Sequence, residues 1–167
     1  MTNRRELESL PLHGLPTDQG TPVAIVVDGD VQRALVLHAE DLAALPAAEV
    51  TADFECREGW CVPGLHWEGV ALRTVLELAG ASSEARFVQV SAHDFSTPIS
   101  AEDASRALLA TRLGDGPLPL EHGGPVRLII PGADCYTSIK WVEHISVTDE
   151  PGDDTARDIA LRRIGQA

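Results

Sequence analysis

Apolar residues in this chain come in short runs, rich in valine and isoleucine, that turn-forming residues soon interrupt. Residues 23–27 are followed by Asp28 and Gly29, and residues 126–130 lie between a Gly-Gly-Pro and a Pro-Gly sequence. Branched side chains pack well on a pleated sheet, and glycine and proline end it, so such runs are typical of strands. No run approaches the length of a transmembrane helix. The pattern therefore predicts short strands around a buried core.

The first two strands are expected to form a hairpin. Residues 23–27 and 34–37 flank the sequence Asp-Gly-Asp at positions 28–30, and Asp-Gly supplies the positive φ angles of a tight hairpin turn. Further strands are expected where apolar runs or alternating residues occur, at 49–55, 87–91, 126–130 and 140–147.

Helical spacing of apolar residues is confined to short segments. Gly80 is placed to end one helix, and Ser100 with Asp103 resembles the capping box that begins another. Residues 56–69 are rich in glycine, proline and polar residues, and we expect an irregular loop there. The expected helices are 39–45, 70–79, 100–113 and 155–164.

The length of 167 residues suits one domain. We expect an extended arm over residues 1–20, the folded domain over 21–150, and a tail over 151–167 that could form a helix. Strands dominate and helices interrupt them irregularly, which predicts an α+β fold with mixed β-sheets and short irregular helices.

The formal net charge of −13 limits the partners of the chain. Nucleic acids and anionic lipid surfaces both bind basic faces, so neither is an expected partner. The two arginines near the N-terminus precede no apolar run of signal-peptide length. Three cysteines without an export signal do not predict a disulfide framework. We therefore expect a soluble cytoplasmic protein without membrane insertion.

Cys56 is the first candidate for chemistry, because it ends a predicted strand and begins a loop. A thiolate is a soft ligand that suits a redox metal, and neighbouring cations lower the pKa of a thiol. Three alternatives stay open at this point: a buried thiol without chemistry, a zinc site with Cys61 and His66, and a thiol redox pair of Cys56 and Cys61.

Arg127 and Lys140 are the second candidate. Arg127 lies inside an apolar run, where a charge must find a partner or lie on an exposed face of an edge strand. Lys140 is the only lysine among 13 cationic residues. It follows a loop of small residues, so the two cations together could hold a phosphate or another anion.

Two long segments resemble those of the sulfite oxidase superfamily, whose members carry an oxidoreductase molybdopterin-binding domain. They are FECREGWCVPGLHWEGVAL at positions 54–72 and LEHGGPVRLIIPGADCYTSIKWV at positions 120–142. The likeness covers roughly residues 22–148 and is greatest to the branch with the methionine-sulfoxide reductase catalytic subunit. It implies a sulfite-oxidase-type molybdopterin-binding domain.

The resemblance also implies roles for particular residues. Cys56 stands where the family binds molybdenum, and Glu58 matches an acidic position near the metal that could relay a proton. The positions that match pterin-binding or phosphate-binding residues are Ser91, His122, Arg127, Ser138, Ile139 and Lys140.

The implied function is molybdopterin-dependent oxygen-atom transfer to or from a small oxo substrate. Because the chain offers no haem or flavin motif, electrons would be exchanged with a separate partner. An alternative is a binding or regulatory module that keeps the fold without the cofactor.

Overall fold

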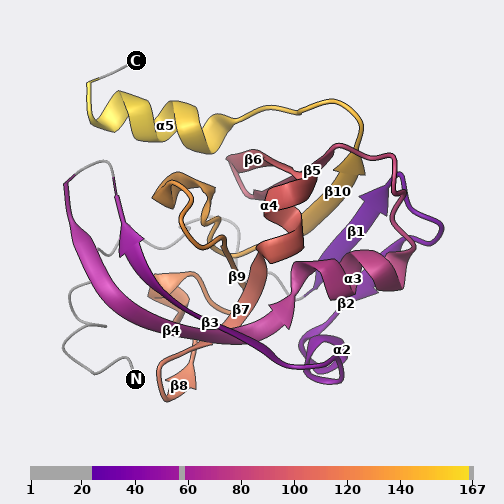
Figure 1. Ribbon diagram of the computed structural model, residues 1–167, viewed down its shortest axis with the longest axis horizontal. Coiled ribbons are helices and arrows are strands. Elements are labelled where there is room, and N and C mark those ends of the chain that lie inside the picture. The colour runs from indigo at the N-terminus through magenta and orange to yellow at the C-terminus, as the bar shows by residue number, and fades with distance from the viewer. Residues whose placement is uncertain (1–23, 57–58, 166–167) are drawn as a thin grey trace.

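The computed structural model describes residues 24–56 and 59–165, and within these ranges the strands form two five-stranded sheets (Figure 1). The predicted arm at residues 1–20 and Glu58 lie outside the described residues. The predicted domain boundaries stay a prediction.

The first sheet has the strand order β2-β1-β10-β5-β6. β1 pairs in parallel with β10, and the remaining neighbours are antiparallel. β1 and β2 pair as predicted, but the expected tight Asp-Gly turn is wrong. Asp28 and Gly29 belong to β1, because its parallel pairing with β10 extends through them, and residues 28–34 connect the paired Val27 and Leu35. The bounds are β1 Ile25–Gly29, β2 Leu35–Leu37, β5 Phe87–Ala92, β6 Phe95–Ser100 and β10 His144–Thr148.

The second sheet has the order β3-β4-β7-β8, and β9 also pairs with β7. Its centre is a long antiparallel hairpin of β3 and β4, which curves across the molecule in Figure 1. The bounds are β3 Ala48–Glu55, β4 Cys61–Ala71, β7 Leu108–Leu113, β8 Gly116–Pro117 and β9 Arg127–Ile129.

Two sequence predictions in this sheet were wrong. β4 covers residues 61–69 of the expected loop and the first two residues of the expected helix 70–79. The strand was missed because a register shift near Gly64 offsets the alternation of buried residues on either side of it. Residues 108–113 form β7, not the end of a helix. The first three residues of β7 are all buried, and a strand covered on both faces loses the alternation that distinguishes it from a buried helix.

The helices are short and lie at the sheet edges. The Ser100 hydroxyl accepts a hydrogen bond from the Asp103 amide, so the predicted cap begins α4, but the helix ends at Arg106. Gly80 ends α3 in the left-handed conformation, with φ of 66°, as predicted. The helices are α2 Ala39–Ala43, α3 Leu72–Ala79, α4 Ala101–Arg106, η1 Leu120–His122, η2 Cys135–Thr137 and α5 Thr155–Arg163.

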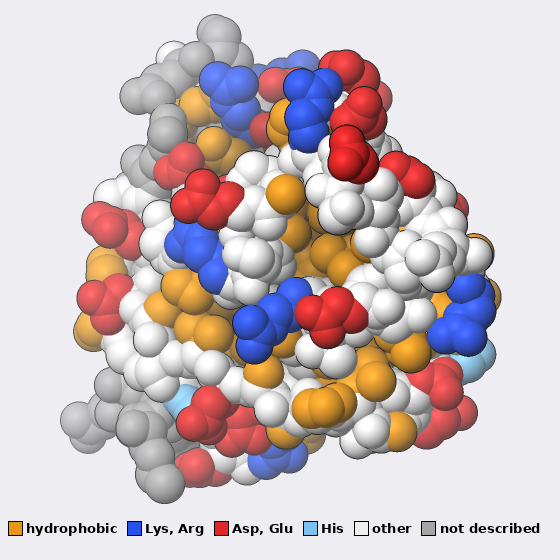
Figure 2. Space-filling model, turned by 45° about the vertical axis from the view of Figure 1, so that its right-hand side comes forward, with side chains coloured by type: hydrophobic (Ala, Val, Ile, Leu, Met, Phe, Trp, Pro, Cys, Tyr) orange, Lys and Arg blue, Asp and Glu red, His pale blue; other side chains and the backbone are white. Residues whose placement is uncertain are grey.

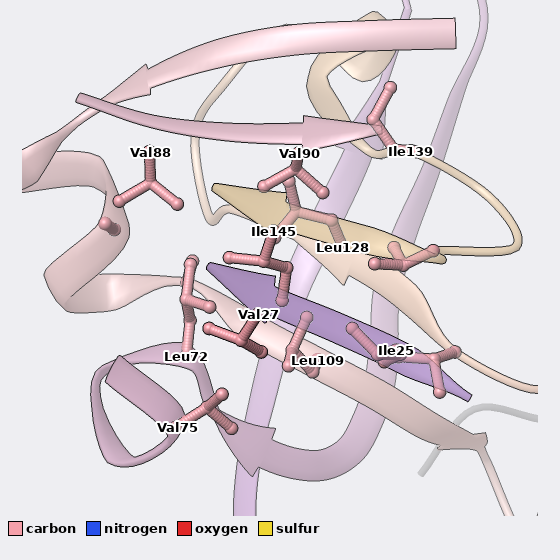
Figure 3. Packing of buried hydrophobic residues seen from close by; sticks show 14 of the residues in the cluster. Ile25, Val27, Leu72, Val75, Val88, Val90, Leu109, Leu128, Ile139 and Ile145 are labelled. Carbon is pink, nitrogen blue, oxygen red and sulfur yellow. The ribbon is translucent and has the colours of Figure 1, made fainter. Parts of the chain in front are cut away.

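The main hydrophobic core lies between the two sheets (Figure 3). Val27 and Ile145 from the first sheet face Leu109 and Leu128 from the second, and Leu72 of α3 closes one side. All five side chains are no more than 2% exposed, so their burial joins the sheets into one body.

A second core lies on the other face of the second sheet. Phe54 of β3, Trp67 of β4, Leu108 of β7 and Ile129 of β9 belong to it. Alternation along β9 places Leu128 in the main core and its neighbours Arg127 and Ile129 on the side of the second core. One strand therefore supplies both cores and directs an arginine into the smaller one.

Acidic and basic side chains are interspersed on the face shown in Figure 2. In the described part of the chain, no helix has the length and apolar character needed to cross a membrane.

We predict that Leu72→Ala lowers the free energy of unfolding by about 2–5 kcal/mol, because it leaves a cavity in the main core. Leu78→Ala is the matched control: Leu78 lies on the same helix and is 39% exposed, so the change should stay within about 0.5 kcal/mol. Urea denaturation measures both. Equal losses for the two variants would contradict the assigned inward face of α3.

Candidate anion site beside Cys56

Arg127 is buried in the second core, with only 6% of its surface exposed. It therefore does not lie on the exposed face of an edge strand, which was one sequence-based interpretation. Its guanidinium carbon lies 4.8 Å from the centre of the Phe54 ring and 5.6 Å from that of the Trp67 ring. Aromatic faces attract a cation and replace part of its lost hydration.

The hydrogen bonds of Arg127 go to backbone carbonyls. Nε donates to the carbonyl of Ser138 over 3.2 Å, and Nη1 donates to that of His122 over 2.9 Å. Within the described ranges, no carboxylate forms a salt bridge with this guanidinium. Burial lowers the pKa of Arg127 to about 10, which leaves it positively charged at neutral pH.

Lys140 and Trp141 reach the same turn, η1. Lys140 Nζ donates to the carbonyl of Glu121 over 2.9 Å, and Trp141 Nε1 donates to that of Leu120 over 2.8 Å. The Trp141 amide donates to the carbonyl of Gly123. These bonds hold Trp141 at φ of 56°, a left-handed conformation that is rare for an aromatic residue. The loop that carries Lys140 is thereby fixed against η1.

The two cations raise the local positive potential in an acidic protein. Burial lowers the pKa of Lys140 to about 8, and the charge of Arg127 contributes to the decrease. Burial and then the charge of Lys140 also lower the pKa of His122. Side-chain Nδ1 of His122 is buried and has no hydrogen-bond partner among the described residues. The site thus offers positive charge and an unused polar atom.

Gly123 makes the close packing of this site possible. A Cβ atom on Gly123 would lie 2.9 Å from Lys140 Cγ and 3.1 Å from Arg127 Cδ. Gly123 also has φ of 106°, which favours glycine. A side chain here would push the two cations away from η1.

Ser138 and Ile139 connect the predicted binding residues. Ser138 is 7% exposed, and its carbonyl accepts from Arg127. Both backbone polar groups of Ile139 are used inside the protein: its amide donates to Thr137, and its carbonyl accepts from Leu128. Ile139 therefore anchors the loop to β9, directly before Lys140.

Cys56 follows the last residue of β3 and begins the turn into β4. Its amide donates to the carbonyl of Trp60, and its carbonyl accepts from the Gly59 amide. Along β3 the more buried residues alternate with exposed ones, and Cys56 continues the series that contains Phe54. Cys56 thus falls on the face of the hairpin where Phe54 contacts Arg127.

A narrow cleft separates the end of β3 from the loop that precedes Lys140. Its lining includes Phe54, Glu55 and Trp67 on one side, and Cys135 and Ser138 on the other. The cleft places the strand that leads to Cys56 beside the loop that leads to Lys140.

Ser91, which was predicted to bind the cofactor, lies in the first sheet, away from the two cations. Ser91 pairs with His144 in the first sheet, and its carbonyl accepts from the Glu143 amide. The Glu143 carboxylate binds the His93 amide, and the His93 ring lies 6.1 Å from that of Trp141. Ser91 is therefore joined to the site through intervening residues.

The structure does not favour the two cysteine-pair alternatives. Cys61 is exposed and lies opposite Glu55 on the hairpin, on the outer face. His66 is on that outer face too and is hydrogen-bonded to Thr51. Cys56 lies on the inner face, so the three residues predicted for zinc do not converge.

Sequence reasoning missed the aromatic walls and the backbone partners. Phe54, Trp67 and Trp141 surround the cations, and the carbonyls of η1 accept their hydrogen bonds. The sequence did hold a signal for one of these contacts, because Trp141 directly follows Lys140, the only lysine. It held none for the contact of Phe54 with Arg127, because these residues are far apart in the chain.

Comparison with known proteins identifies the family. The model of the oxidoreductase molybdopterin-binding domain matches residues 13–156. Because this match covers most of the chain, the protein belongs to that family. The predicted family and fold class are thereby confirmed.

Three relatives illustrate the likeness. The uncharacterized oxidoreductase YuiH of Bacillus subtilis is 34% identical over 127 residues, which are 74% of this chain and 64% of that protein. The protein-methionine-sulfoxide reductase catalytic subunit MsrP of Campylobacter jejuni is 27% identical over 84% of this chain and 54% of its own length. The crystal structure of the sulfane dehydrogenase SoxCD from Paracoccus pantotrophus has a TM-score of 0.70 and 25% identity, over 77% of this chain and 38% of that one. The chain spans less than two thirds of each.

The site fits an anionic pterin cofactor. Among the described residues, no carboxylate forms a salt bridge with Arg127, and the buried nitrogen of His122 has no hydrogen-bond partner. Gly123 lets both cations pack against the turn. These features suit a phosphate-bearing group. Cys56 adds a soft thiol on the same side of the hairpin.

Lys140 predicts a pH dependence of stability. Its pKa of about 8 in the folded protein is below the unfolded value of 10.5, so the unfolded state binds more protons between these values. The contribution of Lys140 to the free energy of unfolding should therefore rise as the pH increases from about 8 to 10.5. The difference in unfolding free energy between wild type and Lys140→Met, measured by urea denaturation at several pH values, tests this. A difference that stays constant across the window would contradict it.

Proposed function

We propose that this chain binds molybdenum–molybdopterin and forms the catalytic unit of an oxidoreductase that transfers an oxygen atom to or from a small oxo substrate. The single observation that carries the proposal is the buried Arg127, which has no carboxylate partner among the described residues and lies beside Lys140. A buried charge left without a counter-ion is costly, and an anionic ligand would supply the counter-ion.

The proposed cofactor-binding role of each residue is based on its position relative to Arg127 and Lys140. Arg127 and Lys140 would hold the phosphate of the cofactor, and His122 would contact it through its buried nitrogen. Ser138 and Ile139 would shape the loop that presents Lys140. Ser91 is a more distant candidate, joined to Trp141 through His93.

Cys56 is the proposed metal ligand. As a thiolate it would bind molybdenum from the protein side, a role that suits a soft sulfur donor. When bound, the cofactor supplies oxygen-atom transfer coupled to a two-electron change at the metal. Glu58 is proposed to move a proton near the metal, since a positioned carboxylate can do so.

Substrate and electron partner are proposed only as classes. The Campylobacter relative is named a methionine-sulfoxide reductase subunit, and a mouse relative is named a sulfite oxidase. A small sulfur oxo compound is therefore the first substrate class to test. A separate redox protein would exchange electrons with the cofactor.

Arg127→Met tests the anion site. Methionine removes the buried charge and keeps apolar volume beside the rings, but it leaves the carbonyls of Ser138 and His122 without their donor. The cofactor-free protein should therefore stay folded and lose about 1–3 kcal/mol of stability. In a host that makes molybdopterin, the purified variant should nevertheless retain much less pterin, measured by fluorescence after acid oxidation.

The matched control is Arg86→Met. Arg86 is an exposed arginine that pairs with Asp149 and Glu150, so its loss should leave pterin content unchanged. Equal pterin in Arg127→Met and wild type would contradict the proposed anion site.

Cys56→Ser tests the metal ligand. Disturbing outer partners of a metal already costs about 10–100-fold in affinity or activity, so loss of a direct ligand should cost at least that much. Sulfoxide reduction with a reduced viologen dye measures turnover, and circular dichroism checks the fold. Cys61→Ser, at the exposed cysteine of the same hairpin, should keep full activity. Full activity in Cys56→Ser would remove the ligand assignment.

A cytoplasmic location is also proposed, on the sequence features alone. Fractionation of cells that express the natural gene, with detection of the protein in each compartment, tests it.

A further inference from the structure

The outer face of the β3–β4 hairpin carries a cluster that the proposed function does not use. Glu49 lies directly opposite Glu68 in the strand register, and Thr51 lies directly opposite His66. Residues two apart on a strand point to the same face. The register therefore brings two carboxylates and one imidazole together, on the side of the hairpin away from Cys56.

Both distances from the His66 ring nitrogen to the carboxylates suit a tetrahedral metal. His66 Nε2 lies 3.3 Å from Glu68 Oε1 and 3.5 Å from Glu49 Oε2. One possible ligand atom from each of the three residues lies within 4.8 Å of the other two. Zinc bonds of about 2.0–2.1 Å at tetrahedral angles separate neighbouring ligand atoms by about 3.4 Å. Two of the three separations match this value.

Two neighbours orient the ligands. The Thr51 hydroxyl is hydrogen-bonded to His66 Nδ1 over 2.9 Å, which directs Nε2 toward the carboxylates. Arg112 Nε lies 3.3 Å from Glu68 Oε2 and leaves Oε1 on the side of His66. Supporting contacts of this kind fix the ring and the carboxylate in protein metal sites.

The charge of the cluster favours a cation. Like charges placed directly opposite on neighbouring strands repel each other, and Glu49 and Glu68 are such a pair. Arg112 offsets part of the charge of Glu68, and a divalent ion between the two carboxylates would lower the repulsion that remains.

We propose that Glu49, His66 and Glu68 bind one zinc ion on the outer face of the β3–β4 hairpin. Three protein ligands leave a fourth position for water or another small ligand. The imidazole favours zinc over magnesium and calcium, which prefer oxygen ligands alone. The site is separate from the molybdenum ligand proposed at Cys56 and does not depend on it.

Metal titration of the whole purified protein, after treatment with a chelator and desalting, tests the proposal. Isothermal titration with Zn²⁺ should give one site per chain that is lost or weakened at least about tenfold in Glu49→Gln, Glu68→Gln and His66→Ala. Glu84→Gln changes an exposed glutamate elsewhere and should bind as wild type does. Glu49→Gln removes one charge from an exposed side chain, so it keeps the test valid if His66→Ala fails to fold.

Co²⁺ distinguishes this site from binding by thiols. The expected visible spectrum is that of tetrahedral cobalt with nitrogen and oxygen ligands, unchanged in Cys61→Ser. A thiolate-to-cobalt absorption band that disappears in Cys61→Ser would overturn the assignment. Zinc binding that is equal in wild type and Glu49→Gln, or absent from wild type, would overturn it as well.

Discussion

The burial of the Arg127 guanidinium is the constraint on which the rest of the site depends. A buried charge requires compensation, and this protein provides it through two carbonyls and two aromatic faces. A carboxylate partner would stabilise the guanidinium more directly, but it would also neutralise the positive potential. Dipoles and ring faces stabilise the cation and leave its net charge available to an anion. The η1 turn and the loop before Lys140 are shaped by the same requirement, since their carbonyls face the cations.

Sheet register couples this site to the hydrophobic core. On β9 the Leu128 side chain enters the main core while Arg127 enters the second one. A shift of one residue would reverse both and bury leucine and arginine in the wrong places. Because the burial of Leu128 is worth roughly 2 kcal/mol by its side-chain area, packing of the main core also fixes the direction of the cation. The backbone bond from the Leu128 amide to Ile139 then holds the Lys140 loop against the same strand.

Local sequence signals predicted the parts of the fold that depend on neighbours in the chain. The Gly80 stop and the Ser100 cap are of this kind, and both are present. The pairing of β1 with β2 is present too, but Asp28 and Gly29 belong to β1 and not to a tight turn. β4 and β7 were missed because a register shift hides alternation in one and burial on both faces hides it in the other. In the site, Lys140 was predicted because it is the only lysine, and Arg127 because it lies inside an apolar run. Their aromatic partner Phe54 did not, because that contact joins residues far apart in the sequence and depends on how the second sheet curves.

The net charge of this protein is negative, whereas the charge at Arg127 and Lys140 is positive. The distance over which each charge acts decides its effect on an anion. At physiological ionic strength the field of surface charges decays over about 8 Å, so the net charge of −13 acts weakly at a distance. At contact, the charges of the buried Arg127 and the half-buried Lys140 dominate, because low local polarity strengthens their interaction with an anion. A simple anion would gain from the two cations alone, while a larger ligand would also gain from a hydrogen bond to the buried nitrogen of His122. A ligand that joins negative charge to a polar group able to bind His122 would therefore gain more from this site than an anion that carries charge only.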